Sequence, residues 1–290
     1  MGYRTVVVGA YEGVLIGVYN LTGELDKALV KEAPGCTILN LTYPPSKGGE
    51  YGKVTFQGLL DAARPLMGTP ARVILVGFSA GGQALRALLT GGGEGADMLA
   101  IDGVHTSKPP HEWSTAPWVA RGNAARQGGA PLVLTHTHIQ PPSYLGTAET
   151  ASIVVPVAGL QGESLPGGGT RYRDGALVVE DWPSGPNDSK AHIYQATKVL
   201  PRALGELVSG QWGTGTPVES PPTADTPTFT PDELPTVPDR PPPSPGEAPS
   251  TAPTLLGVTG PAPGPSSGSG GLLGGLALAL LIAVLLASRD

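Results

Sequence analysis

Along the first 210 residues, short apolar runs alternate with segments whose apolar positions recur every three or four residues. The short runs are rich in Val, Ile and Leu and end at Gly, Pro or Asp, which is typical of strands buried on both faces. Strands that alternate with helices imply βαβ crossovers, because parallel strands need a long connection between them. The sequence therefore predicts a three-layer α/β/α domain with a mainly parallel sheet over residues 1–212.

The pattern also places the individual elements. Strands are expected at residues 5–8, 36–41, 73–76, 98–101, 131–134, 153–157 and 176–179. Helices are expected at residues 22–31, 54–67, 84–89, 118–126 and 192–208. The apolar run 14–19 fits either a loop or a short element, so it carries no assignment. Because parallel strands share one carboxyl edge, reactive groups are expected to gather there.

The strand expected at residues 73–76 leads without a break into Gly77-Phe78-Ser79-Ala80-Gly81, and a helix follows. G-x-S-x-G between a strand and a helix is the pattern of a nucleophile elbow, in which a strained turn exposes the serine hydroxyl. The helix start directs backbone N–H groups at the place where an oxyanion would form. We therefore expect Ser79 to be a nucleophile and Ala80 N–H to be an oxyanion donor. The alternative is a glycine-rich turn without a catalytic role.

A serine hydroxyl needs a base within hydrogen-bond reach, and the base needs a carboxylate that orients it. His192 is the favoured base, because it follows a polar loop and opens the last predicted helix at the same edge as Ser79. Asp102 is the favoured acid, because it directly follows a predicted strand; Glu149 and Asp181 remain alternatives. A helix-start histidine with a capping role and a turn-forming aspartate are the plain alternatives.

Three further histidines, His105, His136 and His138, are expected to line the same pocket. The His-Thr-His sequence has the spacing of metal ligands on one face of a strand, but the sequence shows no acid or third ligand beside it. Neither a metal ion nor a cofactor is therefore predicted. A second oxyanion donor is expected in the loop after the first predicted strand, at Ala10 N–H.

The elbow Gly77-Phe78-Ser79-Ala80-Gly81, followed in order by Asp102 and His192, resembles the α/β-hydrolase superfamily over residues 3–210. The resemblance implies a compact member without the family's first antiparallel strands or a large lid. It also implies an esterase or lipase that acts on a small-molecule or lipid ester through an acyl-enzyme on the serine. The sequence departs from the family pattern in two places. The acid more usually follows the next strand, and Val8-Gly9-Ala10 stands where a His-Gly pair is usual.

A second hypothesis comes from another class of function. The same fold can serve as a catalytically silent domain, displayed on a stalk as a binding or structural module. Labelling of Ser79 by an active-site reagent separates the two hypotheses.

The composition changes after residue 212. Sixteen of the 32 prolines lie between Pro217 and Pro265, and large apolar residues are scarce in residues 213–271. This segment is therefore predicted to be a disordered, extended linker. Residues 272–287 consist of Leu, Ala, Gly, Ile and Val alone. At ~1.5 Å per residue this run is close to the lower length limit for crossing a bilayer core of ~30 Å, so a transmembrane helix is expected there.

Charge and the chain start bear on partners and location. The formal net charge of −6 lies mostly in residues 213–271, which hold six acidic residues and one basic residue. No basic patch points to nucleic acid as a partner. The first residues carry no secretory signal, so a C-terminal membrane span with the domain in the cytoplasm is expected. The tail also resembles a cell-surface sorting signal, which leaves surface display as the alternative.

The single Cys36 is expected in a buried strand.

Overall fold

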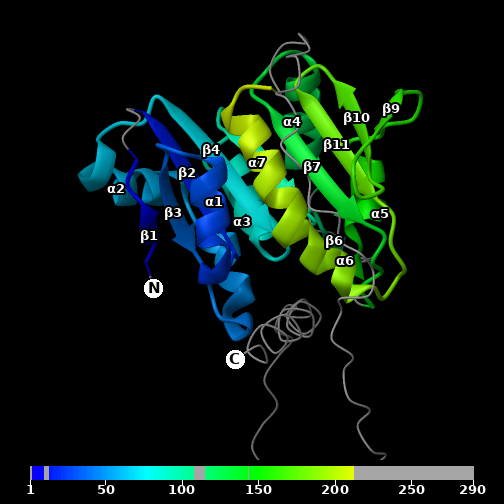
Figure 1. The fold of residues 1–290 in the computed structure, drawn as a ribbon, viewed down its shortest axis with the longest axis horizontal. Coiled ribbons are helices and arrows are strands. Elements are labelled where there is room, and N and C mark those ends of the chain that lie inside the picture. Colours follow the sequence, from blue (N-terminus) through cyan, green and yellow to red (C-terminus); the bar gives the residue numbers. More distant parts are fainter. Residues whose placement is uncertain (1, 10–12, 108–114, 143, 212–290) are drawn as a thin grey trace, which may run out of the picture. The chain divides into compact units, whose positions relative to one another are not determined.

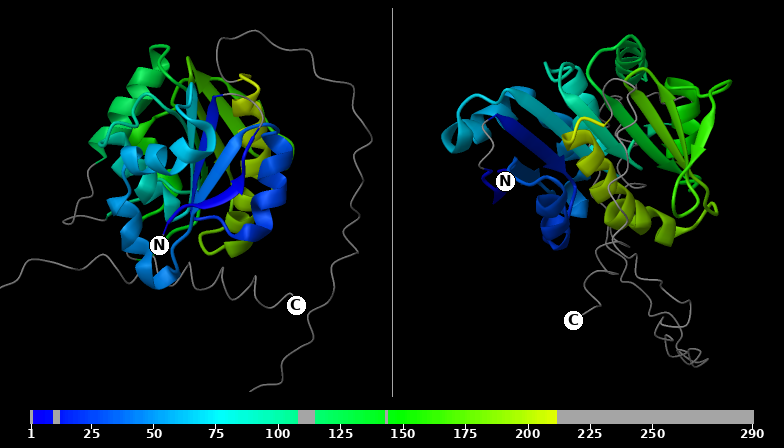
Figure 2. Two further views of the ribbon diagram at one scale, coloured as in Figure 1. Left: turned by 90° about the vertical axis from the view of Figure 1, so that its left-hand side faces the viewer. Right: turned by 45° about the horizontal axis from the view of Figure 1, so that its top comes forward.

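The computed structural model describes residues 2–9, 13–107, 115–142 and 144–211. Within this part, nine strands form one mixed sheet in the order β1-β3-β2-β4-β5-β7-β11-β10-β9. The central strands from β3 to β11 pair in parallel, while β1, β10 and β9 pair antiparallel at the two edges. Helices cover both faces of this sheet (Figures 1 and 2), so the predicted α/β class is confirmed.

The element bounds follow the chain order. The strands are β1 (Arg4–Val7), β2 (Val14–Tyr19), β3 (Thr37–Leu41), β4 (Arg72–Phe78), β5 (Asp97–Ile101), β6 (Thr106–Ser107), β7 (Leu132–Thr137), β8 (Tyr144–Leu145), β9 (Gly162–Ser164), β10 (Thr170–Asp174) and β11 (Leu177–Trp182). The helices are η1 (Gly23–Leu25), α1 (Asp26–Glu32), η2 (Pro45–Lys53), α2 (Phe56–Met67), α3 (Gly81–Leu89), α4 (Ala116–Arg126), α5 (Thr147–Val154), α6 (Ser189–Tyr194), η3 (Gln195–Val199) and α7 (Leu200–Val208). Strands β6 and β8 form a separate two-stranded ribbon.

Each face of the sheet buries its own apolar cluster. Along β4, Leu75 belongs to the cluster that includes Leu85 of α3, whereas Ile74 and Val76 belong to the cluster that includes Leu204 of α7. Successive side chains of a strand point to opposite faces, so a continuous apolar run supplies both clusters. In Figure 1, α1 and α7 lie on the face of the sheet that is turned toward the viewer.

The first strand of the parallel core differs from the prediction. Residues 5–8 were expected to form it, but β1 is a short edge strand, and Val8 at its end is 49% exposed. The unassigned run Val14–Tyr19 instead forms β2, which pairs in parallel with β3 and β4. Apolar character alone could not separate the two runs, because an edge strand and a central strand can both be β-branched.

The structure also differs from the prediction near the other edge of the sheet, where one predicted strand is a helix and two strands were not predicted. Residues 153–157 were expected as a strand, but Ile153 and Val154 end helix α5, whose buried residues include Thr147, Thr150 and Ala151. Helical spacing of buried positions overrides the β-branched run here. The antiparallel strands β9 and β10 escaped prediction because β10 is polar. Its inward residue Arg171 is neutralised by Glu180 of β11, with Nη2 2.7 Å from Oε1.

The last helix, which was expected at residues 192–208, begins at Ser189 and contains a wider π turn at Gln195–Val199. Pro201 follows this turn, and it lacks the N–H that a regular α-helix would use there. The far end of α7 is held by Arg72 of β4, which donates to the carbonyls of Leu207 and Val208. At the start of α6, the Asp188 side chain accepts the N–H groups of Lys190 and Ala191, so the helical segment that includes His192 is held at both ends.

Cys36 is buried, as expected, but it directly precedes strand β3 instead of lying within it, and the sequence has no other cysteine to pair with it. In the described ranges, none of the helices combines the length and the apolar character that a bilayer span needs. The predicted linker (213–271) and the predicted transmembrane helix (272–287) lie outside the described residues.

Candidate active site

Ser79 occupies a sharp turn between β4 and α3. Its φ angle is +52°, in the left-handed region that non-glycine residues seldom adopt. The turn is held by hydrogen bonds from Ser79 N–H to the Ile101 carbonyl (3.1 Å) and from Gly82 N–H to the Ser79 carbonyl (3.0 Å). Helix α3 has no side-chain cap at its start, and no described acceptor takes the Ala80 N–H. The serine is therefore strained and lies beside the open end of a helix.

Close backbone packing around this turn requires glycines. A Cβ atom on Gly81 would lie 2.4 Å from the Tyr19 carbonyl oxygen, and one on Gly82 would lie 1.7 Å from the Gly103 carbonyl oxygen. A Cβ on Gly77 would meet the Gly81 carbonyl oxygen at 2.7 Å. Because these glycines have no Cβ atom, the backbone at the ends of β2 and β5 packs directly against the backbone of the elbow. This packing fixes the position of the elbow.

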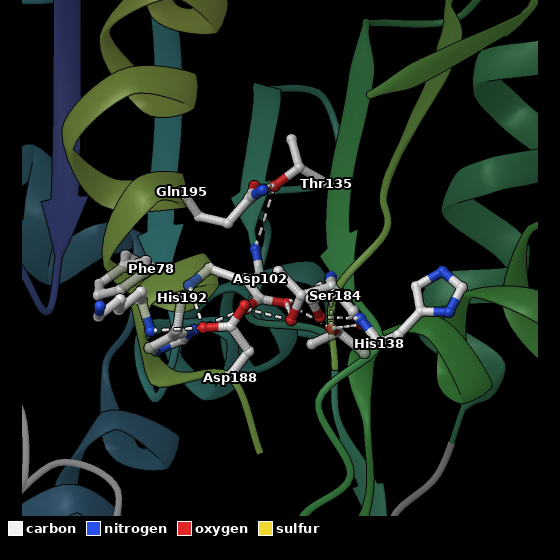
Figure 3. A network of polar contacts seen from close by, with 12 residues as sticks. Phe78, Asp102, Thr135, His138, Ser184, Asp188, His192 and Gln195 are labelled. Carbon is white, nitrogen blue, oxygen red and sulfur yellow. Dashed lines mark hydrogen bonds and ion pairs between the residues drawn. The ribbon is translucent and has the colours of Figure 1, made fainter. Parts of the chain in front are cut away.

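His192 and Asp102 form a buried pair. Nδ1 of His192 lies 2.6 Å from Oδ2 of Asp102, and both residues are 2% exposed. Asp102 directly follows β5, and its φ angle of +42° is also left-handed. The backbone N–H of Asp102 donates to the Thr135 carbonyl at 2.9 Å, which ties this strained residue to β7. Figure 3 shows the imidazole and the carboxylate facing each other.

The Asp102 carboxylate is surrounded by donors. Thr137 donates its backbone N–H (2.9 Å) and its hydroxyl (2.9 Å), and Thr147 donates its hydroxyl. Burial by itself raises the pKa of Asp102, but its contact with His192 and these hydrogen bonds hold the pKa well below its usual range. The group is therefore a buried anion next to an imidazole. Thr137 is the middle residue of the His-Thr-His sequence, which was considered only for its histidines. No sequence pattern pointed to Thr147.

The other ring nitrogen of His192 is available. Nε2 is buried and has no hydrogen-bond partner in the described part of the chain. The ring stacks on Phe78, with 4.6 Å between ring centroids and 28° between planes. Phe78 immediately precedes Ser79, so the imidazole lies against the elbow. Nδ1–H donation to Asp102 leaves Nε2 as the acceptor of a neutral imidazole.

The alternative acids are engaged elsewhere. Glu149 accepts the Gly146 N–H at 2.9 Å and so holds the start of α5. Asp181 lies 2.6 Å from Nε2 of His138. Asp102 is thus the carboxylate that the structure places on His192. His138 points away from His192 in Figure 3.

His105 lies close to the pair. Its ring makes an edge contact with Tyr144, with centroids 5.0 Å apart, and its Nδ1 is buried without a partner among the described residues. Burial lowers the pKa of His105 to about 4, although the negative charge of Asp102 opposes the shift. His105 is therefore a neutral residue beside the site.

The loop after β2 also borders the elbow. Asn20, with a φ angle of +66°, donates its Nδ2 to the Phe78 carbonyl at 3.0 Å and accepts the Tyr51 hydroxyl at 3.0 Å. These bonds link the ends of β2 and β4. Asn20 was not predicted from the sequence, although asparagine is one of the few residues other than glycine that adopt the left-handed conformation.

The expected donor Ala10 lies outside the described residues. The reason for choosing it does not hold, because β1 runs antiparallel and ends beside Thr37, at the start of β3. That is the edge of the sheet opposite to Ser79. The strand that ends beside Ser79 is β2, and the loop at that edge begins with Asn20.

His136 and His138 were expected to line the pocket without a third ligand. The structure corrects the second part of this expectation, because it places Asp181 of β11 beside His136 of β7 and beside His138, which directly follows β7.

No protein-family model matches the chain, and no curated protein matches it.

Proposed function

We propose that residues 1–212 form a serine hydrolase of the α/β-hydrolase kind, which cleaves carboxylic esters through an acyl-enzyme on Ser79. One observation carries the proposal. A serine in a left-handed elbow directly follows Phe78, whose ring stacks on an imidazole with its Nδ1 held by a buried carboxylate and its Nε2 unpaired among the described residues. A buried, unpaired ring nitrogen has a cost in stability, and a proton-accepting role explains why it persists.

The proposed reaction has two halves, and in each of them His192 acts first as a base and then as an acid. As Ser79 Oγ attacks the ester carbonyl, its proton moves to Nε2 of His192, and Asp102 stabilises the imidazolium. The imidazolium then gives this proton to the leaving alcohol. In the second half, Nε2 takes a proton from the water that attacks the acyl-enzyme, and the imidazolium then gives this proton to Ser79 Oγ as the acyl–oxygen bond breaks and the carboxylic acid is released. Hydrogen bonds of this type often tighten only when substrate binds, so the serine–imidazole bond is expected to form in that complex.

The oxyanion would be stabilised by backbone amides. Ala80 N–H is the first donor, since it precedes the hydrogen-bonded part of α3. We assign the second donor to Leu21, in place of Ala10. The Asn20 N–H is already bonded to the Leu41 carbonyl at 3.1 Å, whereas the Leu21 N–H has no acceptor among the described residues. The Leu21 carbonyl accepts from Asn40 (3.0 Å) and Thr42 (2.6 Å), which holds the next peptide unit, while the Asn20 side chain is held by Phe78 and Tyr51 on the preceding side.

Hydrolysis of p-nitrophenyl esters of graded chain length tests the proposal. Wild type should show a burst of one p-nitrophenol per chain followed by slower turnover, because acylation and deacylation are separate steps. Ser79→Ala should abolish both phases. Ser152→Ala, which changes an exposed serine on α5, should leave both phases intact. Folded wild-type protein with no turnover of any ester would favour the silent binding module instead.

The proposal extends to the membrane. The apolar composition of residues 272–287 supports a C-terminal anchor, and the proline-rich residues 213–271 support an extended stalk. We propose that the domain faces the cytoplasm, with surface display as the alternative. Protease added to intact cells should leave the domain uncut in the first case and release it in the second. Recovery of the full-length chain in the soluble fraction would exclude both.

A further inference from the structure

We propose that His136, His138 and Asp181 bind a divalent transition-metal ion of the zinc type. The two histidines are two residues apart at the end of β7, so they lie on the same side of the strand. Asp181 of β11 is the direct partner of His136 in the parallel pairing. The topology therefore brings together a third ligand that lies 43 positions from His138 in sequence.

The distances suit such an ion. Oδ1 of Asp181 lies 3.6 Å from Nδ1 of His136 and 2.6 Å from Nε2 of His138, and all three ligand atoms lie within 4.8 Å of one another. With metal–ligand bonds of about 2.0–2.2 Å, two ligands of a tetrahedral site are roughly 3.3–3.6 Å apart. The 3.6 Å distance from Asp181 to His136 already fits this range. The 2.6 Å distance from Asp181 to His138 is that of a hydrogen bond, and it must lengthen by about 1 Å when the ion replaces the proton.

An unpaired buried atom points independently to a ligand. His136 is 8% exposed, and its Nδ1 has no hydrogen-bond partner among the described residues, although it is directed at the Asp181 carboxylate. At 3.6 Å this contact is too long for a hydrogen bond. Metal coordination would satisfy this nitrogen, the carboxylate and the His138 ring at the same time.

The donor set selects the class of ion. Two imidazoles and one carboxylate suit Zn²⁺ and its neighbours, whereas Mg²⁺ and Ca²⁺ prefer sites built from oxygen alone. The His138 side chain is 47% exposed and that of Asp181 is 28% exposed, which gives the ion a path from solvent and leaves a coordination position for water. Three protein ligands with one open position are typical of zinc sites that are not closed structural centres.

The ion would join two strand ends that lead to the candidate active site. Thr137 stands between the two histidines and donates to Asp102 from the other side of β7. Strand β11 continues through a loop to His192. Metal binding should therefore stabilise this edge of the sheet. Binding itself does not depend on the proposed hydrolase activity.

Calorimetric titration of the metal-stripped full-length chain with ZnCl₂ tests the site, with a purification tag that contains no histidine. One Zn²⁺ per chain should bind, and the melting temperature should rise with Zn²⁺ concentration. His138→Ala and Asp181→Asn should each weaken binding at least tenfold, since even the loss of groups that only support ligands costs about 10–100-fold. Asp61→Asn, which removes an exposed carboxylate on α2, should bind like wild type. MgCl₂ should produce no stabilisation.

Two outcomes of the titration would overturn the proposed metal site. Absence of Zn²⁺ binding in folded wild-type protein would show that His138 and Asp181 form only a hydrogen bond with each other. Binding that both variants retain would place the ion elsewhere. Co²⁺ provides a second measurement, because a tetrahedral site gives it intense visible absorption. Loss of that absorption in Asp181→Asn, with an unchanged melting temperature of the metal-free protein, would separate lost coordination from misfolding.

Discussion

Nδ1 of His192 lies 2.6 Å from Oδ2 of Asp102, although the two residues are 90 positions apart in the chain. Asp102 follows β5 and His192 lies in α6, and both face the carboxyl edge of the sheet at which β4 delivers Ser79. The anion is kept charged inside the protein by the imidazole and by threonine donors from β7 and α5. The pair therefore has the arrangement that a general base requires.

Replacement of Asp102 by asparagine should remove this orientation. The amide keeps the shape of the carboxylate but cannot accept from His192, Thr137 and Thr147 in the same way. We expect kcat for ester hydrolysis to fall by about 10³–10⁴-fold. Asp61→Asn is the matched control, because it removes an exposed carboxylate on α2. Equal losses in both variants would assign no special role to Asp102.

The stability of the domain should depend on pH through His105. Burial lowers the pKa of His105 to about 4, below the value of about 6.5 in an unfolded chain. The unfolded state therefore binds the proton first, and the free energy of unfolding should fall by about 1–3 kcal/mol as the pH decreases from 6.5 to 4. Urea unfolding at a series of pH values measures this slope.

His105→Gln should flatten the same slope. It should not abolish it, because burial also lowers the pKa of His136. A slope of His105→Gln identical to that of wild type would show that His105 is readily protonated in the folded protein.

Asn20 should stabilise the fold both through its left-handed backbone conformation and through the hydrogen bonds of its side chain. Asn20→Gly keeps the left-handed φ but leaves the Phe78 carbonyl and the Tyr51 hydroxyl without their partner, at a cost of about 1–3 kcal/mol. Asn20→Ala should cost about 1 kcal/mol more, because alanine is strained at this φ angle. Chemical denaturation gives both values. Equal stability of the two variants would argue against backbone strain.

Gly82 should tolerate no side chain. The Cβ of Gly82→Ala would meet the Gly103 carbonyl oxygen at 1.7 Å, so the elbow and the end of β5 must move apart. We expect loss of ester hydrolysis together with a lower melting temperature. Gly95→Ala is the control, since no atom lies within 4 Å of its added Cβ. A fully active Gly82→Ala variant would contradict the close packing described for the elbow.

The sequence was sufficient to predict β4 and the elbow that follows it. The continuous apolar run of β4 and the glycine pattern after it predicted the elbow, because both are local features. The choice between β1 and β2 as the first core strand depends on which strand has neighbours on both sides, and no local pattern contains that information. The same limit explains why the loop after β1 was expected at the edge of the sheet where Ser79 lies.

Contacts between distant segments were the least predictable part of the site. Thr147 and Asn20 act through bonds to Asp102 and Phe78 that exist only once the sheet has formed. Asp181 was considered as an acid for His192, whereas the register of β7 and β11 brings it to His136 and His138. Strand register is a tertiary property, so the third ligand could not be paired with its histidines from spacing alone.

Reaction with a fluorophosphonate, followed by mass measurement of the intact chain and of its peptides, tests the serine nucleophile most directly. Folded wild-type protein should gain a single adduct on Ser79, and Ser79→Ala should gain none while keeping its melting temperature within a few degrees. His192→Gln should react far more slowly, because Nε2 no longer accepts the serine proton. No adduct on folded wild-type protein, or an equal adduct on Ser79→Ala, would contradict the proposed hydrolase.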